Sequence, residues 1–391
     1  MNPISDSKPT GGQRPTWAQI DLSAVAKNFQ IIKNHVGPDV GVMAVVKANA
    51  YGHGAVECAT RLQAEGADWF GVALPEEAIE LRNAGITQPI MCLAGFWPGQ
   101  AEACVQHKLV PAAYRLDMLE ALDNAAAAAG VTADVHVKVD TGMGRLGVRF
   151  DEVNEFTSAL KRFKHLRVDG LMTHFAAADE PSCGPLTKDQ VERFGHAVAA
   201  FRENGFNPTY RHLANSAGIF AETAGSGSDP ATRGNMVRPG GVLYGLWRDI
   251  LDPEHRDQEF QPVMSLHSRI TFLKWVPSGE TVGYGCTFEA SRKTLVATIP
   301  VGYDDGYMRA LSNRGHAIIR GVYATVIGRI SMDLTLIDVT NVPDVQLDDE
   351  VILLGREGKL SITAEELARI AGTLSYEVTC GVGGRVPRIA E

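Results

Sequence analysis

The chain has 391 residues, of which 45% are hydrophobic and 21% are charged. This length exceeds one typical core and the composition is that of a globular protein, so we expect two folded domains. The formal net charge of −9 excludes a general nucleic-acid binder, which needs a basic face to neutralise phosphates. No run reaches the roughly 18 apolar residues that a membrane helix requires.

The cysteines and the first residues bear on the compartment. Six cysteines are scattered along the chain without a CxxC pair, which argues against a zinc site and against a disulfide framework. Residues 1–15 are polar, contain proline and glycine, and lack the apolar segment of a signal peptide. We therefore expect reduced thiols, a flexible N-terminal tail over residues 1–15, no metal, no membrane partner and a cytoplasmic location.

From residue 16 to residue 247, short apolar runs alternate with helical patterns. Strands are expected within 41–46, 69–74, 89–95, 133–139, 166–176, 210–218 and 235–245, and helices within 55–66, 75–85, 101–109, 151–163 and 187–205. Repeated βα units with about eight strands are typical of a parallel sheet closed into a TIM-type (β/α)8 barrel. The sequence thus predicts an α/β fold with this barrel over 16–247.

The pattern changes after Trp247. Apolar, turn-separated runs occur at 265–276, 294–303, 316–329, 334–340 and 350–355, with one helical pattern at 361–372. Such short, closely spaced runs predict strands. We expect a mostly β C-terminal domain over residues 248–391.

Several polar residues fall where the expected barrel strands end, which is where the active sites of such barrels lie. Lys47 follows GVMAVV, His174 ends VDGLMTHF, Asn215 and Ser216 end RHLANS, and Arg238 ends NMVR before a Pro-Gly-Gly turn. Each of these has an ordinary structural explanation when taken alone. Their common position at one rim indicates a shared polar site.

A dinucleotide-binding fold is the competing interpretation. Gly142, Gly144 and Gly147 form G-x-G-x-x-G after a strand-like run, and Asp169 lies about twenty residues further on. The motif sits deep in the series of βα units, however, and Arg145 occupies its interior, where close backbone approach to a pyrophosphate would be needed. The glycines are equally able to shape a loop that presents Arg145.

The segment AVVKANAYGHG resembles the lysine motif of alanine racemases. The segments KVDTGMGRLG, HLANSA, MVRPGGVLYG, VGYGCTF, GRISMD and RVPR are similar to other motifs of that family, in the same order. The resemblance covers nearly the whole chain after the tail. It implies pyridoxal 5′-phosphate (PLP) as cofactor, alanine as substrate, and a head-to-tail homodimer with shared active sites. It also makes the G-x-G-x-x-G match a coincidence.

The resemblance assigns the cofactor-binding residues. Lys47 matches the lysine that binds PLP covalently, an amine that must be neutral to react. The matches for the phosphate site and its surroundings are Tyr51, Asn215, Ser216, Gly240 and Gly241. Backbone N–H groups and hydroxyls suit a permanently bound phosphate. The family often has a bulkier residue at the position of Gly241, so a looser contact is expected there.

Arg238 matches the arginine that faces the pyridine nitrogen of PLP. Because a guanidinium only donates hydrogen bonds, it implies an unprotonated ring nitrogen, a weaker electron sink and little transamination. His174 matches the histidine bonded to this arginine. His212 is similar to another member of the network, although an ordinary structural role stays open for it.

The remaining matches concern the substrate. Arg145 and the backbone at Met332 match groups near the substrate carboxylate. Lys138 matches a lysine that is often carbamylated and then holds the arginine, although a plain strand lysine is the alternative. Tyr376 matches a tyrosine that crowds the cofactor and limits the side chain of the substrate.

Racemisation needs acid/base groups on both faces of the substrate, because a single base would mostly return the proton to the same face. Lys47 is expected on one face, and Tyr284, contributed by the partner subunit, on the other. Cations such as Arg238, acting through His174, would have to lower the tyrosine pKa. The supporting positions are Asp333 at the same interface and Arg388 near the terminus.

Three alternatives share parts of this pattern. A single-domain PLP carrier would lack the β domain and Tyr284, a decarboxylase of the same fold type would release carbon dioxide, and a broad-specificity racemase would typically be exported. The sequence leaves open whether D-alanine is made for peptidoglycan or degraded.

Overall fold

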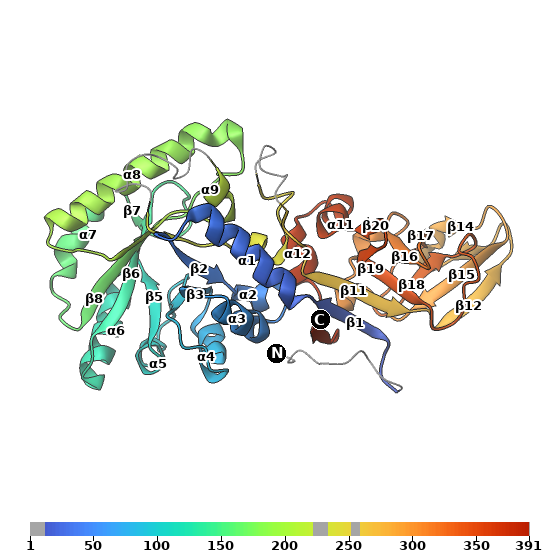
Figure 1. The fold of residues 1–391 in the computed structure, drawn as a ribbon, viewed down its shortest axis with the longest axis horizontal. Helices are drawn as coiled ribbons and strands as arrows, with labels where there is room; N and C mark the ends of the chain where they lie inside the picture. The colour runs from blue at the N-terminus through green and yellow to red at the C-terminus, as the bar shows by residue number, and fades with distance from the viewer. Residues whose placement is uncertain (1–11, 222–233, 252–258, 391) are drawn as a thin grey trace.

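A computed structural model describes residues 12–221, 234–251 and 259–390. Figure 1 shows two bodies placed end to end, a barrel with its helices and a body of strands that come mostly from the second half of the chain. Within the described ranges, the helices are all too short or too polar to cross a bilayer.

Eight parallel strands form the barrel, in the order β10-β2-β3-β4-β5-β6-β8-β9. Asn235 joins the two ends of this order: its N–H donates to the Arg211 carbonyl and its carbonyl accepts from the Gly41 N–H, both at 2.9 Å. The (β/α)8 barrel expected from the sequence is confirmed. Its strands are β2 (Gly41–Val45), β3 (Trp69–Val72), β4 (Ile90–Cys92), β5 (Leu109–Ala113), β6 (Ala133–Asp140), β8 (Leu166–Met172), β9 (Tyr210–His212) and β10 (Met236–Val237).

The strands are buried on both faces, as parallel strands under a layer of helices must be. In β6, Val135, Val137 and Val139 join the core shared with the helices, whereas the alternate residues His136 and Lys138 face the other way. A separate cluster that includes Met43, Trp69, Met91 and Met172 comes from different barrel strands. These side chains fill the barrel interior, so the barrel is a packed core.

Helices surround the barrel (Figure 1). They are α1 (Leu22–Val36), α3 (Ala55–Ala64), α4 (Pro75–Asn83), α5 (Ala101–Gln106), α6 (Leu116–Ala129), α7 (Val153–Leu160), α8 (Gly184–Glu203) and the short α9 (Ser216–Phe220). Helix α1 begins after Asp21, whose carboxylate accepts from the Ala24 N–H at 2.8 Å and so caps a free donor. Strand β5 and helices α1 and α6 were not among the predicted elements. The strand was missed because its sequence, LVPAA, is short and contains a proline.

The second body is a ten-stranded sheet with the order β12-β15-β18-β17-β16-β19-β11-β1-β21, and β20 pairs with β19. Its strands are β1 (Thr16–Ile20), β11 (Met264–Arg269), β12 (Phe272–Val276), β15 (Thr294–Ile299), β16 (His316–Ile319), β17 (Val322–Ile327), β18 (Thr335–Asp338), β19 (Glu350–Glu357), β20 (Leu360–Ile362) and β21 (Arg388–Ala390). Helices α11 (Ala364–Ala371) and α12 (Ser375–Cys380) follow. The mostly β domain expected after the barrel is confirmed.

Strand β1 differs from the expectation that residue 16 begins the barrel. It pairs antiparallel with β11 and parallel with β21, with Trp17 opposite His267 and Ala18 opposite Arg388. The first strand therefore belongs to the second sheet. The local sequence could not reveal this, because both partners lie about 250 or more residues further along the chain.

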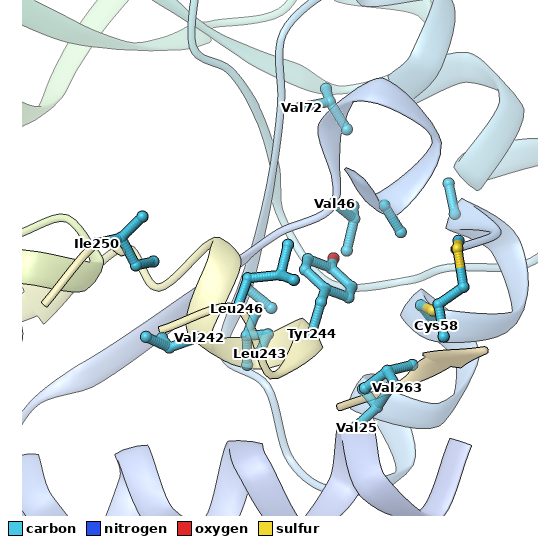
Figure 2. Packing of buried hydrophobic residues seen from close by; sticks show 14 of the residues in the cluster. Val25, Val46, Cys58, Val72, Val242, Leu243, Tyr244, Leu246, Ile250 and Val263 are labelled. Atoms are coloured by element: carbon cyan, nitrogen blue, oxygen red, sulfur yellow. The ribbon is translucent and has the colours of Figure 1, made fainter. Parts of the chain in front are cut away.

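Tyr244 lies fully buried in the core between barrel and helices, in the 3-10 turn η2 (Gly241–Tyr244). Figure 2 shows its ring among Leu243, Val46 and Cys58, and its hydroxyl donates to the Val45 carbonyl at 2.9 Å. This bond ties the segment after β10 to the end of β2. Both segments carry candidate site residues.

Candidate active site

The site residues predicted for the barrel converge on the C-terminal ends of its strands. Lys47 follows β2, Lys138 lies near the end of β6, His174 follows β8, Ser216 opens α9 after β9, and Arg238 follows β10. Electrostatic interactions join Lys47, Lys138 and Arg238 with one another and with the loop residue Arg145. The structure therefore brings the predicted barrel residues together at one rim.

Lys47 begins a turn with left-handed backbone geometry. Ala48, Asn49, Ala50 and Tyr51 have φ angles between +52° and +55°, a conformation that costs an L-residue about 1–2 kcal/mol. Surrounding contacts must offset this cost. Asn49 Oδ1, for example, accepts from the Ala55 N–H at 2.8 Å. Strain held at such a point is typical of functional sites.

Gly52 ends this turn with a φ of +89°, and a Cβ atom there would lie 2.2 Å from the Thr379 carbonyl oxygen. Arg388 fixes the same point, because its Nε donates to the Gly52 carbonyl at 3.1 Å. The other guanidinium nitrogens of Arg388 donate to the carbonyls of Gly383, Val386 and Val382. The predicted network arginine thus joins the lysine turn to the C-terminal segment.

The lysine amines at the rim are poised to lose a proton. Burial and then the charge of Arg145 lower the pKa of Lys47. The same two causes, followed by Arg238 and Lys47, lower the pKa of Lys138 to about 8. Burial disfavours the charged form and neighbouring cations repel it. Both residues therefore have a larger neutral fraction at physiological pH than a free lysine.

Arg238 is the hub of the buried network. Nη1 donates to the His212 carbonyl (2.7 Å) and to His212 Nδ1 (3.0 Å). Nη2 donates to the carbonyls of Thr173 (2.7 Å) and Leu213 (3.0 Å) and to His174 Nδ1 (3.2 Å). Burial lowers the pKa of Arg238 to about 9, so the guanidinium stays charged at neutral pH.

The donors of Arg238 dictate the tautomers of its neighbours. Because arginine only donates, His212 and His174 accept at Nδ1 and carry their hydrogen at Nε2. His212 Nε2 lies 2.8 Å from His136 Nδ1, so His212 donates and His136 in turn carries its hydrogen at Nε2. Burial followed by the charge of Arg238 lowers the pKa of His136 to about 3 and that of His174 to about 2. The three rings are therefore neutral.

The turn after Arg238 is tightly packed. A Cβ on Gly240 would lie 2.4 Å from the Tyr51 hydroxyl, and one on Gly241 would lie 2.3 Å from the Tyr376 ring. The Gly240 N–H donates to Ser216 Oγ at 2.9 Å, which leaves the Ser216 hydroxyl hydrogen available to a ligand. The ring of Tyr376 thus occupies the space that a larger residue at position 241 would need.

The charge of the site favours an anionic ligand. In the part of the chain that the structure describes, the cations Arg145 and Arg238 form no salt bridge with a carboxylate, and neither do the amines of Lys47 and Lys138. A group of uncompensated cations beside neutral amines suits a phosphate and a carboxylate. The residues present therefore fit a small phosphorylated aldehyde and an amino-acid substrate.

The G-x-G-x-x-G loop has a different role from the nucleotide site that was considered. Asp140 Oδ1 accepts from the N–H groups of Gly142 and Gly144, both at 3.0 Å, so a carboxylate lies where a phosphate would have to bind. A Cβ on Gly147 would lie 2.4 Å from the Asp140 nitrogen. The glycines shape the loop that carries Arg145. The dinucleotide interpretation is wrong for this barrel.

Residues predicted on the second domain lie apart from the rim in the same chain. Tyr284 lies in the 3-10 turn η4 (Tyr284–Cys286) between β13 (Thr281–Val282) and β14 (Phe288–Glu289), and Figure 1 shows β14 at the end of the sheet remote from the barrel. Tyr284 is 72% exposed and Met332 is 51% exposed. Asp333 accepts from Arg385 at 2.9 Å. This chain alone does not bring Tyr284 to Lys47.

Three side chains that contact the rim segments were not predicted from the sequence. Besides His136, they are Glu77 and Gln190. Gln190 Nε2 donates to the His174 carbonyl (3.0 Å) and to Thr141 Oγ1 (3.2 Å), while its Oε1 accepts from the Ala176 N–H (3.0 Å). It thereby joins the loops after β6 and β8. A buried glutamine on a helix gives no such signal in the sequence.

Comparison with known proteins identifies relatives over the whole chain. The family model for the alanine racemase N-terminal domain matches residues 20–247, and that for the C-terminal domain matches residues 263–390. A curated alanine racemase of Geobacter sulfurreducens is 45% identical over 380 residues, which cover 96% of this chain and 97% of that protein.

Solved structures agree with this comparison. The alanine racemase of Bacillus anthracis with bound L-Ala-P is 32% identical with a TM-score of 0.88, over 98% of this chain and 96% of that one. The alanine racemase of Bartonella henselae with covalently bound pyridoxal phosphate is 28% identical with a TM-score of 0.84, over 96% and 99% of the two chains.

Proposed function

The chain belongs to the alanine racemase family and interconverts the enantiomers of alanine, and we propose that it does so with PLP bound to Lys47. The observation that carries the proposal is the environment of this amine, which is partly buried, interacts with the charges of Arg145 and Arg238, and has a lowered pKa. A neutral amine next to uncompensated cations is what capture of a phosphorylated aldehyde requires.

The cofactor would be held by the residues around the rim. Ser216, Tyr51 and the Gly240–Gly241 turn would bind its phosphate, with Asn215 shaping the turn, since the Asn215 side chain accepts from the Gly218 N–H at 2.9 Å. When bound, PLP withdraws electrons from the substrate Cα and so makes its hydrogen acidic. All four Nη hydrogens of Arg238 face acceptors within the protein. The Nε–H of Arg238 is therefore the donor that would face the pyridine nitrogen of PLP.

Two groups would move the proton. Lys47 would act on one face of Cα, and Tyr284 of a second copy of the chain on the other. The exposure of Tyr284 favours a head-to-tail homodimer, because the residue is free to enter another subunit's site. His174 carries its hydrogen at Nε2, which would donate to the phenolic oxygen of this tyrosine and stabilise its ionised form.

The substrate carboxylate would lie between Arg145 and the backbone N–H of Met332 from the second subunit, near Asp333. Tyr376 would limit the side chain to the size of a methyl group, because its ring already packs against Gly241 and, at a centroid distance of 5.2 Å, against Tyr51. This crowding supports alanine over the larger substrates of decarboxylases.

Lys138 would be carbamylated. Its pKa of about 8 leaves a substantial neutral fraction, and only a neutral amine adds carbon dioxide. A new N–C bond forms, the amine nitrogen releases one proton to solvent, and the product is a carbamate anion. This anion would turn the repulsion between Lys138 and Arg145 into attraction and fix the arginine. The supporting observation is that Arg145 occurs in none of the salt bridges among the described residues.

We also place the enzyme in the cytoplasm. All six cysteines are free, and Cys58, Cys92 and Cys104 are buried, as expected for a protein from a reducing compartment.

Borohydride reduction of the PLP-loaded protein, followed by peptide mapping, tests the proposal. The expected result is one label, on Lys47. Lys47→Ala should lose the label and the visible absorbance of bound PLP, together with nearly all interconversion of L- and D-alanine, whereas Lys27→Ala, an exposed lysine on α1, should lose neither. A label on a different lysine would refute the assignment.

A further inference from the structure

Glu77 connects two loops at the mouth of the barrel. It lies in the first turn of α4, and its Oε2 accepts from the N–H groups of Ala73 (2.7 Å) and Leu74 (3.0 Å), which precede this helix. Its Oε1 accepts from the N–H of Ala48 at 2.7 Å. Ala48 is the residue after Lys47, and it comes from the loop after a neighbouring barrel strand.

An ordinary helix cap would explain only half of these contacts. A glutamate at the third helical position commonly accepts from the backbone N–H groups before its own helix, as Oε2 does here. The bond from Oε1 reaches a residue 29 positions earlier in the chain and contributes nothing to the cap. The carboxylate therefore has a second function, directed at the Lys47 turn.

That turn has a particular need for the bond. Its later N–H groups find partners close by, since Ala50 donates to the Val46 carbonyl (2.9 Å) and Gly52 to the Ala48 carbonyl (3.0 Å). Ala48 is the first left-handed residue, with φ +52°, and its N–H donates to Glu77. The charged acceptor strengthens this hydrogen bond, which lies on the solvent-exposed side of the turn.

The charge of Glu77 also acts on the lysine amine. Arg145 and Arg238 lower the pKa of Lys47, and the carboxylate of Glu77 raises it. The same side chain thus limits the effect of the surrounding cations while it fixes the neighbouring peptide.

We infer that Glu77 is the positioning residue of Lys47: its carboxylate binds the Ala48 amide, holds the left-handed turn, and so keeps the Lys47 amine at the barrel mouth. The inference rests on the proposed role of Lys47 as the cofactor lysine. In this inference Glu77 acts on Lys47 through the Ala48 amide.

Glu77→Gln is the sharpest test, because it keeps the size of the side chain and removes one acceptor. An amide group has one oxygen, so its NH2 must face either the Ala48 N–H or the two N–H groups before α4. Glu76→Gln is the matched control. Glu76 is the adjacent residue of the same helical turn, carries the same charge, and accepts from Gln100 Nε2 at 2.7 Å.

Hydrogen exchange in the cofactor-free protein measures the protection of the backbone amides in the Lys47 turn. In Glu77→Gln, amides of residues 47–53 should exchange at least about tenfold faster, the effect of losing a hydrogen bond to a charged group. Glu76→Gln should exchange like the wild type. Equal exchange in the two variants, whether fast or slow, would overturn the inference.

Capture of PLP gives a second readout. The variant Glu77→Gln should take up PLP more weakly, and the pH at which Lys47 becomes reactive should move downward, because a carboxylate that raises the amine pKa has been removed. A stability loss with unchanged capture and unchanged pH dependence would show that Glu77 only caps α4, and would overturn the inference.

If Glu77→Gln fails to fold, the inference can be tested by replacing the Lys47–Ala48 peptide bond with an ester. It deletes the donor and leaves Glu77 and its cap intact. Faster exchange around the turn supports the inference, and wild-type exchange with wild-type PLP capture overturns it. A wild-type protein that bound PLP elsewhere would refute the proposed role of Lys47, yet the exchange result for Glu77 would stand.

Discussion

Single side chains at the barrel mouth are set to opposite protonation states by their surroundings. Burial and mutual repulsion favour the neutral form of Lys47 and Lys138, while Arg238 keeps its charge because five acceptors surround it. A site that needs a neutral amine and a permanent cation within one small volume can meet both demands only with these two residue types. Replacing Arg238 by lysine would remove the planar guanidinium and most of its N–H donors.

Tyr284→Phe should separate the two directions of proton transfer. The ring is kept and the hydroxyl is removed, so racemisation should fall by about 10²–10⁴-fold, the range for loss of a general acid or base. With Lys47 intact, solvent deuterium should still enter the α-position of D-alanine, while exchange into L-alanine nearly disappears. Mass spectrometry of the recovered enantiomers measures both.

Tyr323→Phe serves as the control, because Tyr323 is an exposed tyrosine of the same domain whose hydroxyl donates to the Ser361 carbonyl at 3.0 Å. The Tyr323→Phe variant should incorporate deuterium into alanine and racemise alanine at wild-type rates. Equal deuterium incorporation into both enantiomers by Tyr284→Phe would count against two opposed bases.

At the level of elements, a chain of hydrogen bonds connects several barrel strands, and in each bond the donor and the acceptor are fixed by the one before it. They run from Arg238 after β10 to His212 on β9 and on to His136 on β6, and from Arg238 to His174 after β8. A Cβ on Gly170 of β8 would lie 2.6 Å from the His136 ring, so that glycine makes the room for this ring. The geometry of the site is therefore a property of the whole barrel end.

Buried neutral histidines should make the protein sensitive to acid. Burial lowers the pKa of His53 to about 4, that of His136 to about 3 and that of His174 to about 2. Below the unfolded-state value of about 6.5, the unfolded chain binds protons that the folded chain does not. The free energy of unfolding should thus fall as pH decreases from 6.5, by about 1.4 kcal/mol per pH unit for each such histidine.

Denaturant unfolding of the cofactor-free protein between pH 6.5 and pH 5 measures this slope. His53→Asn keeps a donor for the Ala50 carbonyl, to which His53 Nδ1 donates at 2.9 Å, and should reduce the slope by about one such increment. His165→Asn, at an exposed histidine, is the control. A slope that His53→Asn leaves unchanged would contradict the prediction.

The whole molecule presents its two proposed acid/base groups on different bodies. Lys47 lies at the barrel mouth, while Tyr284 is exposed on a hairpin at the remote end of the second sheet (Figure 1). The proposed shared site therefore requires a second copy of the chain. In a symmetric pair, each chain would place its hairpin at the other's barrel.

Mixing Lys47→Ala with Tyr284→Phe tests this arrangement. In a mixed dimer with shared sites, one site would carry both changes and the other would carry neither. Random exchange of subunits should therefore restore about a quarter of wild-type activity, since half of the dimers are mixed and each has one intact site. No recovery after demonstrated subunit exchange would refute a site built from two chains.

The sequence by itself determined the class of the fold and placed the candidate barrel residues at one rim. Alternation of short apolar runs with helical patterns is a local property, and a residue that follows an apolar run, such as Lys47 or Arg238, is found at a strand end without knowledge of the rest. The motifs then supplied the family. They also assigned a role to the exposed Tyr284, which stays a prediction.

Only the tertiary structure decided which distant groups meet. The partners of β1, the bond from Glu77 to Ala48, and the contact of His136 with His212 join residues that lie between 29 and more than 350 positions apart along the chain. Hydrogen bonds and strand pairing depend on distance in space, whereas the spacing of apolar residues along the chain gives information only about residues close in sequence. A glutamate that only caps its own helix and a glutamate that also binds the Lys47 turn have the same local sequence pattern, and only the folded chain distinguishes them.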